Sequence, residues 1–450
     1  MTECNGQPLL FSSLGTKKIL ADFDGGDLTS DGGLPLLREV DRKIGLIDAL
    51  NAAIADPRCP WLIEHDQRTL LAQRIFAIAA GYEDLNDHQT LRDDTLLQAI
   101  TDRPTCKQAD PLSSPPTLCR LENRVRRDDL VRMANVLVET FIASHATPPK
   151  ELLLDFDATD DAVHGNQEGR FFHGYYDHYC FLPLYVTCGQ QLLVAYLRPA
   201  NIDAAKHSRA ILKLLVTRFR QVWPKVKIIV RGDSGFCRWK WMRWCDRHGV
   251  DYILGLAKNA RLKPLARRSM TTARWHYRCT GQKQRLFEEF DYAAATWDRQ
   301  RRVIAKAEHT AGGENPRFVV TSLPGNPQTL YDDLYCQRGD MENRIKEQQL
   351  GLFADRTSCQ KFLANQFRVL VSAAAYVLME TLRRVGLCGT ELATAQVTTI
   401  RLKLLKIGGR IVRSVRRIVL HLASGYPLRN LYQTVLRNLR EWGCIPAPAS

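Results

Sequence analysis

The chain has 450 residues, of which 45% are hydrophobic, and a formal net charge of +15 at pH 7. This composition is that of an ordinary globular protein, and the length predicts two or three domains. No apolar run approaches the roughly 18 residues that a membrane helix needs, and no secretory signal is expected at the N-terminus. The longest apolar run, around residues 369–379, is expected to form a buried core helix.

The excess of positive charge predicts a polyanionic partner, most often nucleic acid. Arginines gather along the chain at residues 267–268, 299–302 and 410–417. The 13 cysteines are scattered, without CxxC pairs or histidines at the spacing of a zinc site. We therefore expect reduced thiols in a cytoplasmic protein and no structural zinc.

An all-helical domain is predicted for residues 1–149. After an extended, turn-rich start, apolar side chains recur at helical spacing from residue 34 onward. The expected helices cover residues 34–50, 68–80, 88–100 and 118–146. Pro148 and Pro149 end this domain.

From residue 150 short apolar strands alternate with helices. The expected strands are residues 151–158, 175–189, 191–199, 225–233 and 252–258, with helices at 205–223 and 237–248. A right-handed crossover can place the fourth strand parallel to the first. Asp157 and Asp233, which end those two strands, would then lie side by side where ligands bind to α/β sheets.

Residues 262–328 interrupt this pattern with basic sequence followed by alternating strands, which predicts an inserted, mainly β subdomain. The sheet domain would therefore have two parts, residues 150–261 and 329–390. A long apolar helix in the second part is expected to cover the sheet.

Residues 391–450 are predicted to form a basic C-terminal region. Apolar and basic residues alternate there on both sides of Gly408 and Gly409. The alternation favours a β-hairpin that turns at the two glycines over a basic amphipathic helix.

A short helix is predicted between residues 335 and 349. Spacings of four, four and three residues place charged and polar side chains on one helical face, with a tyrosine one turn upstream. These residues are Arg338, Glu342, Lys346 and Gln349, and the tyrosine is Tyr335. Taken alone, such a face is typical of a solvated, salt-bridged helix.

Three acids, Asp157, Asp233 and Glu342, are predicted to converge on one edge of the sheet. Clustered carboxylates repel each other unless a cation lies between them. Mg²⁺ takes oxygen ligands, often a few carboxylates together with substrate phosphates. A pair of such ions stabilises the attacking and leaving oxygens of phosphoryl displacement, and the basic charge elsewhere would hold DNA.

These residues resemble the motifs of bacterial insertion-sequence transposases of the DDE type. The first motif, D-x-T, matches Asp157 and Thr159, and the second matches residues 231–236. The third motif of the branch in question, Y-x2-R-x3-E-x6-K, is matched by Tyr335, Arg338 and Glu342. Residues 81–94 and 115–124 of the helical domain are also similar to this family.

The last position of the third motif departs from the pattern, because Gln349 stands where lysine is expected. Lys346 is one turn closer on the same predicted face and can take its place. The first metal ligand also has an alternative, because Asp155 shares a strand face with Asp157. The D-x-T match favours Asp157.

The resemblance implies an RNase H-like mixed sheet flanked by helices, and cut-and-paste movement of DNA. Two Mg²⁺ ions, for which Mn²⁺ can substitute, would be held by Asp157, Asp233 and Glu342 and would activate water to nick DNA at the element ends. The freed 3′-OH would then attack target DNA, with a hairpin on the element end as one route.

By the same resemblance, Tyr335, Arg338 and Lys346 would contact phosphates near the cleaved end. Arginine suits phosphate as a bidentate donor and lysine suits it as a point charge. The expected partners are double-stranded DNA, both terminal inverted repeats and target, and a second protomer on the paired ends. We expect a cytoplasmic, nucleoid-associated protein with no membrane partner and a DNA-binding N-terminal domain.

Two other functions remain open from the sequence. An RNase H-like nuclease or resolvase would cut DNA without joining it, and a transposase-derived protein would bind DNA without activity. The helical domain and the inserted strands favour the transposase over the nuclease, and the complete acid triad favours it over the inactive binder. His164 and His173 are expected to be structural, as are the tryptophans at 239, 241 and 244.

Overall fold

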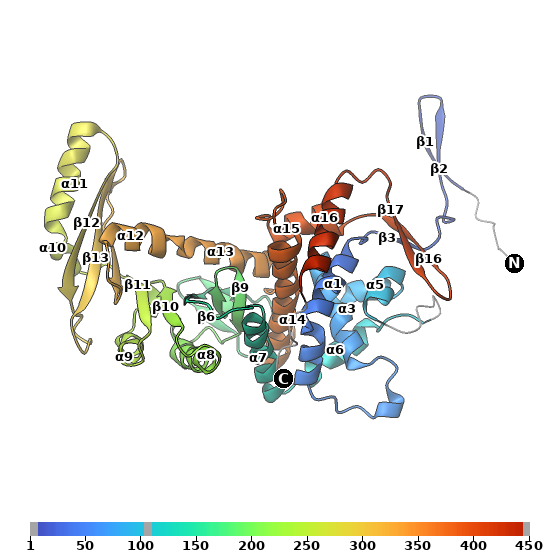
Figure 1. The fold of residues 1–450 in the computed structure, drawn as a ribbon, viewed down its shortest axis with the longest axis horizontal. Helices are drawn as coiled ribbons and strands as arrows, with labels where there is room; N and C mark the ends of the chain where they lie inside the picture. The colour runs from blue at the N-terminus through green and yellow to red at the C-terminus, as the bar shows by residue number, and fades with distance from the viewer. Residues whose placement is uncertain (1–7, 103–109, 444–450) are drawn as a thin grey trace. The chain divides into compact units, whose positions relative to one another are not determined.

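The chain forms two units in the computed structural model, which describes residues 8–102 and 110–443 (Figure 1). The helical unit contains the described residues up to Val125, Gly351–Phe353 and the described residues from Ala374 onward. The sheet unit contains Arg126–Leu350 and Ala354–Ala373. The fold is mixed α/β, with a large mixed sheet and helices, as the sequence predicts.

A mixed sheet of nine strands, counted over the described residues, is the frame of the sheet unit. Its strand order is β12-β13-β15-β11-β10-β4-β8-β9, with the short β14 beside β13. The strands are β4 (Glu151–Ala158), β8 (Leu184–Cys188), β9 (Gln191–Tyr196), β10 (Lys227–Gly232), β11 (Asp251–Leu256), β12 (Gln284–Tyr292), β13 (Arg301–Thr310), β14 (Gly313–Glu314) and β15 (Arg317–Thr321). β10 runs parallel to both β4 and β11, which confirms the predicted parallel pair.

The two faces of this sheet are covered by different helices, because successive side chains of a strand point to opposite sides. On one face Leu154, Phe156 and Val230 share a core with side chains of α7 (Arg127–Ala143), α8 (Ser208–Val222) and α9 (Trp239–Arg247).

On the other face Ile229 and Ile253 pack against a helical segment that follows α12 (Pro327–Thr329). This segment, residues 330–350, is called the α13 segment after its α-helical part, α13 (Gly339–Lys346). Figure 1 shows α12 and α13 on one side of the sheet and α8 and α9 on the other.

The predicted inserted subdomain is continuous with the main sheet. β15 pairs antiparallel with β11 on one side and with β13 on the other, so the later strands extend the sheet. The same stretch contains helices α10 (Leu262–Leu265) and α11 (Arg267–Thr280), so it is less purely β than the sequence predicts. The alternation of apolar and polar residues predicts that strands exist. It does not predict which strands pair with each other, because the pairing partners are distant in sequence.

The predicted strand over residues 175–189 divides into two strands in different sheets. β7 (His178–Phe181) lies between β5 (Asp161–Ala162) and β6 (Phe171–His173) in a small sheet, whereas β8 joins the main sheet.

The predicted apolar helix is α14 (Phe362–Thr381), and it is anchored on the sheet edge. Gln366 accepts a hydrogen bond from the Leu197 amide at 2.7 Å and donates one to the Ala195 carbonyl at 3.1 Å. Phe362–Gly386 is long and apolar enough to cross a membrane, but it is mostly buried inside the protein, as a core helix is.

The helical unit combines the two ends of the described chain. Its helices are α1 (Leu34–Ile44), α2 (Leu46–Ala53), α3 (Gln67–Ala80), α4 (His88–Leu91), α5 (Thr95–Ile100), α6 (Pro115–Arg124), α15 (Val397–Ile400) and α16 (Arg429–Glu441). The predicted boundary at residue 149 differs from this division, because α7 belongs to the sheet unit. Phe141 of α7 packs against Phe219 of α8 with ring centroids 5.6 Å apart and the ring planes tilted by 56°.

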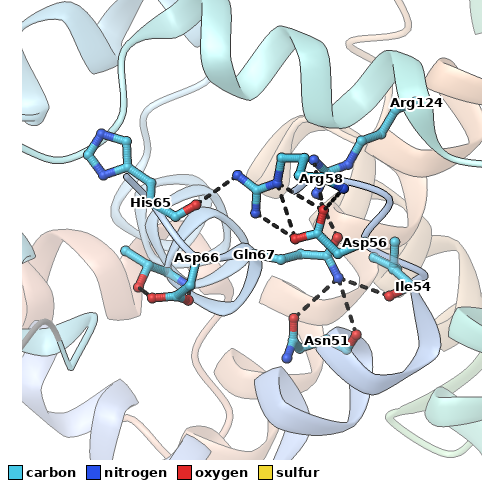
Figure 2. A network of polar contacts seen from close by, with 9 residues as sticks. Asn51, Ile54, Asp56, Arg58, His65, Asp66, Gln67 and Arg124 are labelled. Atoms are coloured by element: carbon cyan, nitrogen blue, oxygen red, sulfur yellow. Dashed lines mark hydrogen bonds and ion pairs between the residues drawn. The ribbon is translucent and has the colours of Figure 1, made fainter. Parts of the chain in front are cut away.

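Polar contacts fix the loop between α2 and α3 (Figure 2). Arg58 donates to the His65 carbonyl at 2.8 Å, and Gln67 donates to the Ile54 carbonyl at 3.0 Å. Arg124, the last residue of α6, donates to the Gln67 amide oxygen at 2.6 Å. The network ties α6 to the start of α3, and it satisfies backbone carbonyls that the loop would otherwise leave unpaired.

Three strands lie at the surface of the helical unit beside a separate exposed hairpin. The hairpin consists of β1 (Leu9–Leu14) and β2 (Lys17–Ala21), and the three-stranded sheet has the order β17 (Ile418–Leu422), β16 (Gly409–Arg413), β3 (Leu28–Thr29). The predicted C-terminal hairpin therefore exists, but it does not turn at Gly408 and Gly409.

The turn instead covers residues 414–417, where the Ser414 amide donates to the Arg417 carbonyl at 2.8 Å. The preceding residues, Arg401–Leu405, form a helical turn. Gly409 is needed inside the sheet, because a Cβ there would lie 3.0 Å from Leu420 Cδ1 and 3.2 Å from the His421 carbonyl. Gly409 thus serves close packing between strands, whereas a Cβ at Gly408 would have no neighbour within 4 Å. Local pattern does not distinguish a glycine packed between strands from one in a turn.

Candidate active site

Asp157 and Asp233 lie next to each other at the ends of adjacent parallel strands. Asp157 is in β4, and Asp233 directly follows β10, where its carboxylate caps a short 3-10 turn. Gly232 pairs with Phe156 in the strand register, so the two acids form the next pair. By strand alternation both acids point to the face that carries Ile229, which the α13 segment covers.

Asp155 has a different environment, although it shares this face. Both of its carboxylate oxygens accept from Arg231, whose Nη2 is 2.7 Å from Oδ2. Arg231 also donates to the Leu334 carbonyl of the α13 segment. Asp155 and Arg231 are 3% and 4% exposed. The buried ion pair occupies Asp155 completely and supports Asp157 as the acid that is available for chemistry.

Arg338 is the counterion of Asp157. Its Nη1 donates to Asp157 Oδ2 at 3.1 Å, and the Asp157 side chain is 15% exposed. Burial raises the pKa of Asp157 to about 6, against the lowering effect of Arg338. The neighbouring carboxylates of Asp233 and Glu342 raise this pKa further, so Asp157 lies in the negative field of both other predicted acids.

Glu342 faces solvent instead of the two strand-end acids. Its carboxylate accepts from Lys346 at 2.9 Å, and its side chain is 62% exposed. The hydrogen bond from Lys346 lowers the pKa of Glu342. Across residues 8–102 and 110–443, no three His, Cys, Asp or Glu side chains gather closely enough to hold a metal ion.

The donor set nevertheless fits a hard divalent cation. Two carboxylates meet at one sheet edge, and the pKa of Asp157 is raised mainly by burial and also by the neighbouring Asp233 carboxylate. Clustered carboxylates of this kind bind cations, and carboxylate oxygens are the ligands that Mg²⁺ prefers. Arg338 supplies the compensating charge here, and Glu342 lies one helical turn beyond it.

The charged side chains of the α13 segment point to different places, unlike the single face that the sequence predicts. The segment is helical from Leu330, with a π-helical and then a 3-10 turn before Gly339, so Gly339 continues a helix and does not open one. Arg338 points to the sheet, whereas Lys346 is 58% exposed. Gln349 donates to the Asp160 carbonyl at 2.8 Å and holds the loop that follows β4.

A pocket of about 320 Å³ opens beside Asp233. Its wall is mostly polar, aromatic and cationic, with residues from the ends of β10, β11 and β15 and from the α13 segment. The residues that carry its chemistry are Asp233, Lys258, Arg317, Tyr331, Tyr335 and Arg338. Lys258, Arg317 and Tyr331 are not found by sequence reasoning, because each belongs to a separate element without a motif around it.

Gly255 of β11 makes room for Tyr335 in this pocket. A Cβ at position 255 would lie 2.6 Å from the Tyr335 hydroxyl oxygen and 2.9 Å from the Ser234 amide nitrogen. Real Cβ atoms do not approach other atoms so closely, so any side chain at this position would displace the tyrosine or the turn after Asp233. Burial raises the pKa of Tyr335, and the carboxylate of Asp233 raises it further.

The three candidate tryptophans have structural positions. Trp241 is 2% exposed and its ring lies 5.7 Å from that of Phe156 in the sheet core. Trp239 and Trp244 are partly buried against the same core. These contacts fit the predicted structural role of the tryptophans.

Comparison with known proteins decides the family. Residues 11–444 match the family described as transposase DDE domain group 1. The chain belongs to the DDE transposases. Members of this family cleave phosphodiester bonds and transfer DNA strands, so the protein is an enzyme of that kind.

The comparison with solved structures finds the piggyBac transposase in a synaptic complex with hairpin DNA. The two chains are 12% identical with a TM-score of 0.44, and the alignment covers 94% of this transposase and 83% of the other chain. The search of curated proteins found no match for this transposase.

Proposed function

We propose that this transposase moves a bacterial insertion sequence by cut and paste, with an RNase H-like core and the Y-R-E-K type of third motif. It binds the terminal inverted repeats, cleaves at the element ends and joins the 3′-OH ends to target DNA. The observation that carries the proposal is the adjacency of Asp157 and Asp233 at the ends of β4 and β10, under the segment that bears Glu342.

Asp157, Asp233 and Glu342 would hold two Mg²⁺ ions, or Mn²⁺ in their place. When bound, these ions lower the pKa of water and stabilise the attacking and leaving oxygens of phosphoryl transfer. Arg338 balances the charge of Asp157 and moves to a phosphate when DNA enters. Glu342 leaves Lys346 and turns to the two other acids in the same step.

The pocket beside Asp233 would receive the DNA strand near the scissile phosphate. Arg338, Arg317 and Lys258 give it positive charge, and Tyr335 offers a hydroxyl donor. Arginine binds phosphate bidentately and lysine as a point charge. Lys346 is exposed and can reach a phosphate on the solvent side.

The working form in this proposal is a pair of protomers on paired element ends in the bacterial cytoplasm, at the nucleoid. Its DNA partners are the inverted repeats and the target duplex. The net charge of +15 supports a DNA partner, because each phosphate that a cation neutralises adds to affinity by release of counterions.

The test uses the full-length protein, labelled DNA from the flanks of its own reading frame, supercoiled target and Mg²⁺ or Mn²⁺. Asp157→Asn, Asp233→Asn and Glu342→Gln should each reduce cleavage by at least about a thousandfold while the gel shift persists. The matched control is Asp340→Asn, which removes an exposed carboxylate from the same helix and should cleave like wild type.

The products distinguish the three functions that the sequence leaves open. Joined products support the transposase, and cleavage without joining supports a nuclease. A gel shift without cleavage supports an inactive binder. Wild-type rates in Asp233→Asn would show that the site is elsewhere.

A further inference from the structure

The C-terminal part of the helical unit carries a one-sided concentration of positive charge. Residues 392–440 contain ten lysines and arginines and no aspartate or glutamate, in a chain whose total net charge is +15. Ordinary protein surfaces mix both signs, so a stretch of 49 residues without a carboxylate indicates a polyanionic partner.

Some of these cations have partners within the helical unit. Lys406 forms an ion pair with Asp31 at 2.6 Å, and Arg413 forms one with Asp27 at 3.0 Å. Arg401 donates to the carbonyl of Ala79 at 2.9 Å. These contacts stabilise the fold, and they leave the charge of other arginines for a partner outside the chain.

Arg410, Arg416 and Arg417 are exposed, and within the described parts of the chain no carboxylate forms an ion pair with them. All three belong to the ribbon of β16, β17 and the turn between them, residues 409–422. Arg416 and Arg417 are in the turn itself. Two of these exposed arginines therefore lie next to each other at the tip of a hairpin.

The base of this ribbon is fixed, whereas its tip is open to solvent. β16 pairs with β3, the Ile411 amide donates to the Asp27 carbonyl at 2.7 Å, and Ile411 is buried. Figure 1 shows β16 and β17 extending as a ribbon beyond the neighbouring helices of their unit. A fixed base with a free tip presents the turn in a defined direction and limits the entropy lost on binding.

An apolar side chain lies at the tip among the arginines. Val415 is 104% exposed, so its whole side chain is in water. Val412 and Val419 form a cross-strand pair on one face of the ribbon, and they are 43% and 38% exposed. Side chains that insert into the minor groove of DNA show this combination, with arginine between the phosphates and an apolar wedge against the bases.

We propose that the turn at residues 414–417 inserts into the minor groove of double-stranded DNA. Arg416 and Arg417 lie between the two phosphate backbones, and Val415 contacts the sugar and base edges at the groove floor. The minor groove is about 6 Å wide, which suits a single turn with arginine side chains better than a whole helix. The inference rests on the proposed function and assigns one contact surface of its DNA substrate.

The experiment compares two double variants of the full-length protein on 40-base-pair duplexes, one AT-rich and one GC-rich. Arg416→Ala/Arg417→Ala removes the charge of the turn. Arg437→Ala/Arg440→Ala removes the same charge from exposed positions of α16 in the same unit. Thermal unfolding checks that both variants fold, which is expected because all four side chains are exposed.

The turn variant should bind AT-rich DNA at least tenfold more weakly than wild type. The slope of log affinity against log salt should fall by about two, because each lost phosphate contact removes about 0.9. The α16 variant should keep the wild-type slope. Netropsin, which fills the minor groove, should compete with wild type and not with the turn variant. Val415→Ser should reduce the preference for AT-rich DNA at an unchanged salt slope.

Equal losses in both double variants would overturn the proposal, because they would show a general charge effect. Insensitivity to netropsin would overturn the minor groove as the contact. The full-length protein could instead bind phosphatidylglycerol vesicles more tightly than DNA. If the turn variant loses that vesicle binding, the tip is assigned to a membrane and the proposal is overturned. A turn variant that binds and cuts DNA as well as wild type does would refute this inference and leave the proposed function intact. If wild type binds DNA more tightly than the turn variant but does not cut it, the proposed function is refuted and this inference stands.

Discussion

At the residue scale, two aspartates two positions apart on β4 differ in what faces them. Arg231 takes both oxygens of Asp155 in a buried pair, whereas Asp157 accepts from Arg338 at 3.1 Å and lies beside Asp233. A buried ion pair gives little net stability, but removal of one partner leaves an uncompensated charge inside the protein. Loss of the Asp155–Arg231 pairing should therefore reduce stability, whereas loss of the Asp157 carboxylate should affect cleavage.

We expect Arg231→Met to lower the free energy of unfolding by about 3 kcal/mol or more, because it strands the buried Asp155 carboxylate. Asp157→Asn should keep the fold, because burial already disfavours the charged form of Asp157. The same variant should lose cleavage, because it lacks a carboxylate of the proposed metal site. Denaturant unfolding of both variants in EDTA measures the difference. Equal stability losses in the two variants would contradict this division into a structural and a catalytic aspartate.

At the scale of the element, the α13 segment supplies cations to the acids that it faces. Arg338 binds Asp157 across 181 residues of sequence, and Lys346 binds Glu342 four residues away. The first pair is partly buried and the second is exposed, so the Coulomb attraction is stronger in the first. In the proposed metal site, each guanidinium or ammonium group would compete with a metal ion for the carboxylate to which it is bound.

Arg338→Gln should raise the affinity of the DNA-free protein for Mn²⁺ by about tenfold, because it removes the competing cation from Asp157. The same variant should bind and cleave DNA less well, because it loses a side chain that would donate hydrogen bonds to a DNA phosphate. Lys346→Gln is the control and should change the Mn²⁺ affinity less, since its pair with Glu342 is screened by solvent. Isothermal titration with Mn²⁺ measures both, and an unchanged affinity in Arg338→Gln would exclude the competition.

At the scale of the whole molecule, each of the two units has its own core and its own response to pH. In the helical unit His88 is fully buried, and its Nδ1 lies 3.0 Å from the amide nitrogen of Gln73. Burial lowers the pKa of His88 from 6.5 to about 3. Asp41 of the same unit has its pKa raised by burial to about 6, which acts in the opposite direction.

The sign for His88 follows from proton binding. The unfolded chain binds its proton below pH 6.5 and the folded protein only near pH 3, so acid favours unfolding between these values. At pH 5 the loss should be about 2 kcal/mol. Asp41 offsets part of this loss in wild type between about pH 6 and 3.8, because its folded form keeps a proton there.

His88→Asn isolates the histidine, because asparagine retains an acceptor for Gln73 and does not titrate. The variant should lose less stability than wild type when the pH falls from 7 to 5, as measured by denaturant unfolding of the helical unit. Parallel stability curves over that pH range would contradict the assignment. Gln73 also donates to the Ser113 carbonyl at 2.9 Å, so a change at His88 affects more than one contact. The test therefore compares the change in stability between pH 7 and pH 5 within each protein, and not the stabilities of the two proteins at one pH.

Part of the fold was predictable because it depends on local pattern. Apolar strands ending in Asp157 and Asp233, with a helix between them, predict a parallel pair with both acids at one edge, and the structure confirms that pair. The β-hairpin expected in the C-terminal region is also observed, as β16 and β17. The spacing of Tyr335, Arg338 and Glu342 indicates the family, which the match over residues 11–444 confirms.

Other features depend on partners that are distant in sequence. Whether Asp155 or Asp157 is available depended on Arg231, which is 76 residues from Asp155. The glycine pair at 408–409 looked like a turn, but Gly409 pairs with β3 and β17 and packs closely against β17. Gly255 and Lys258 join the site because β11 ends beside Asp233.

The sequence by itself determined which residue types this transposase has for the proposed binding of metal and DNA, and on which elements they lie. Only the tertiary structure decided which cation faces which carboxylate, and that the β insertion continues the main sheet. The physical reason is that periodicity fixes the face of one helix or strand, whereas ion pairs and strand pairing are chosen between elements by packing. Arg338 and Glu342 lie on the same helical segment, but Arg338 binds Asp157 of the sheet whereas Glu342 binds Lys346 of its own helix.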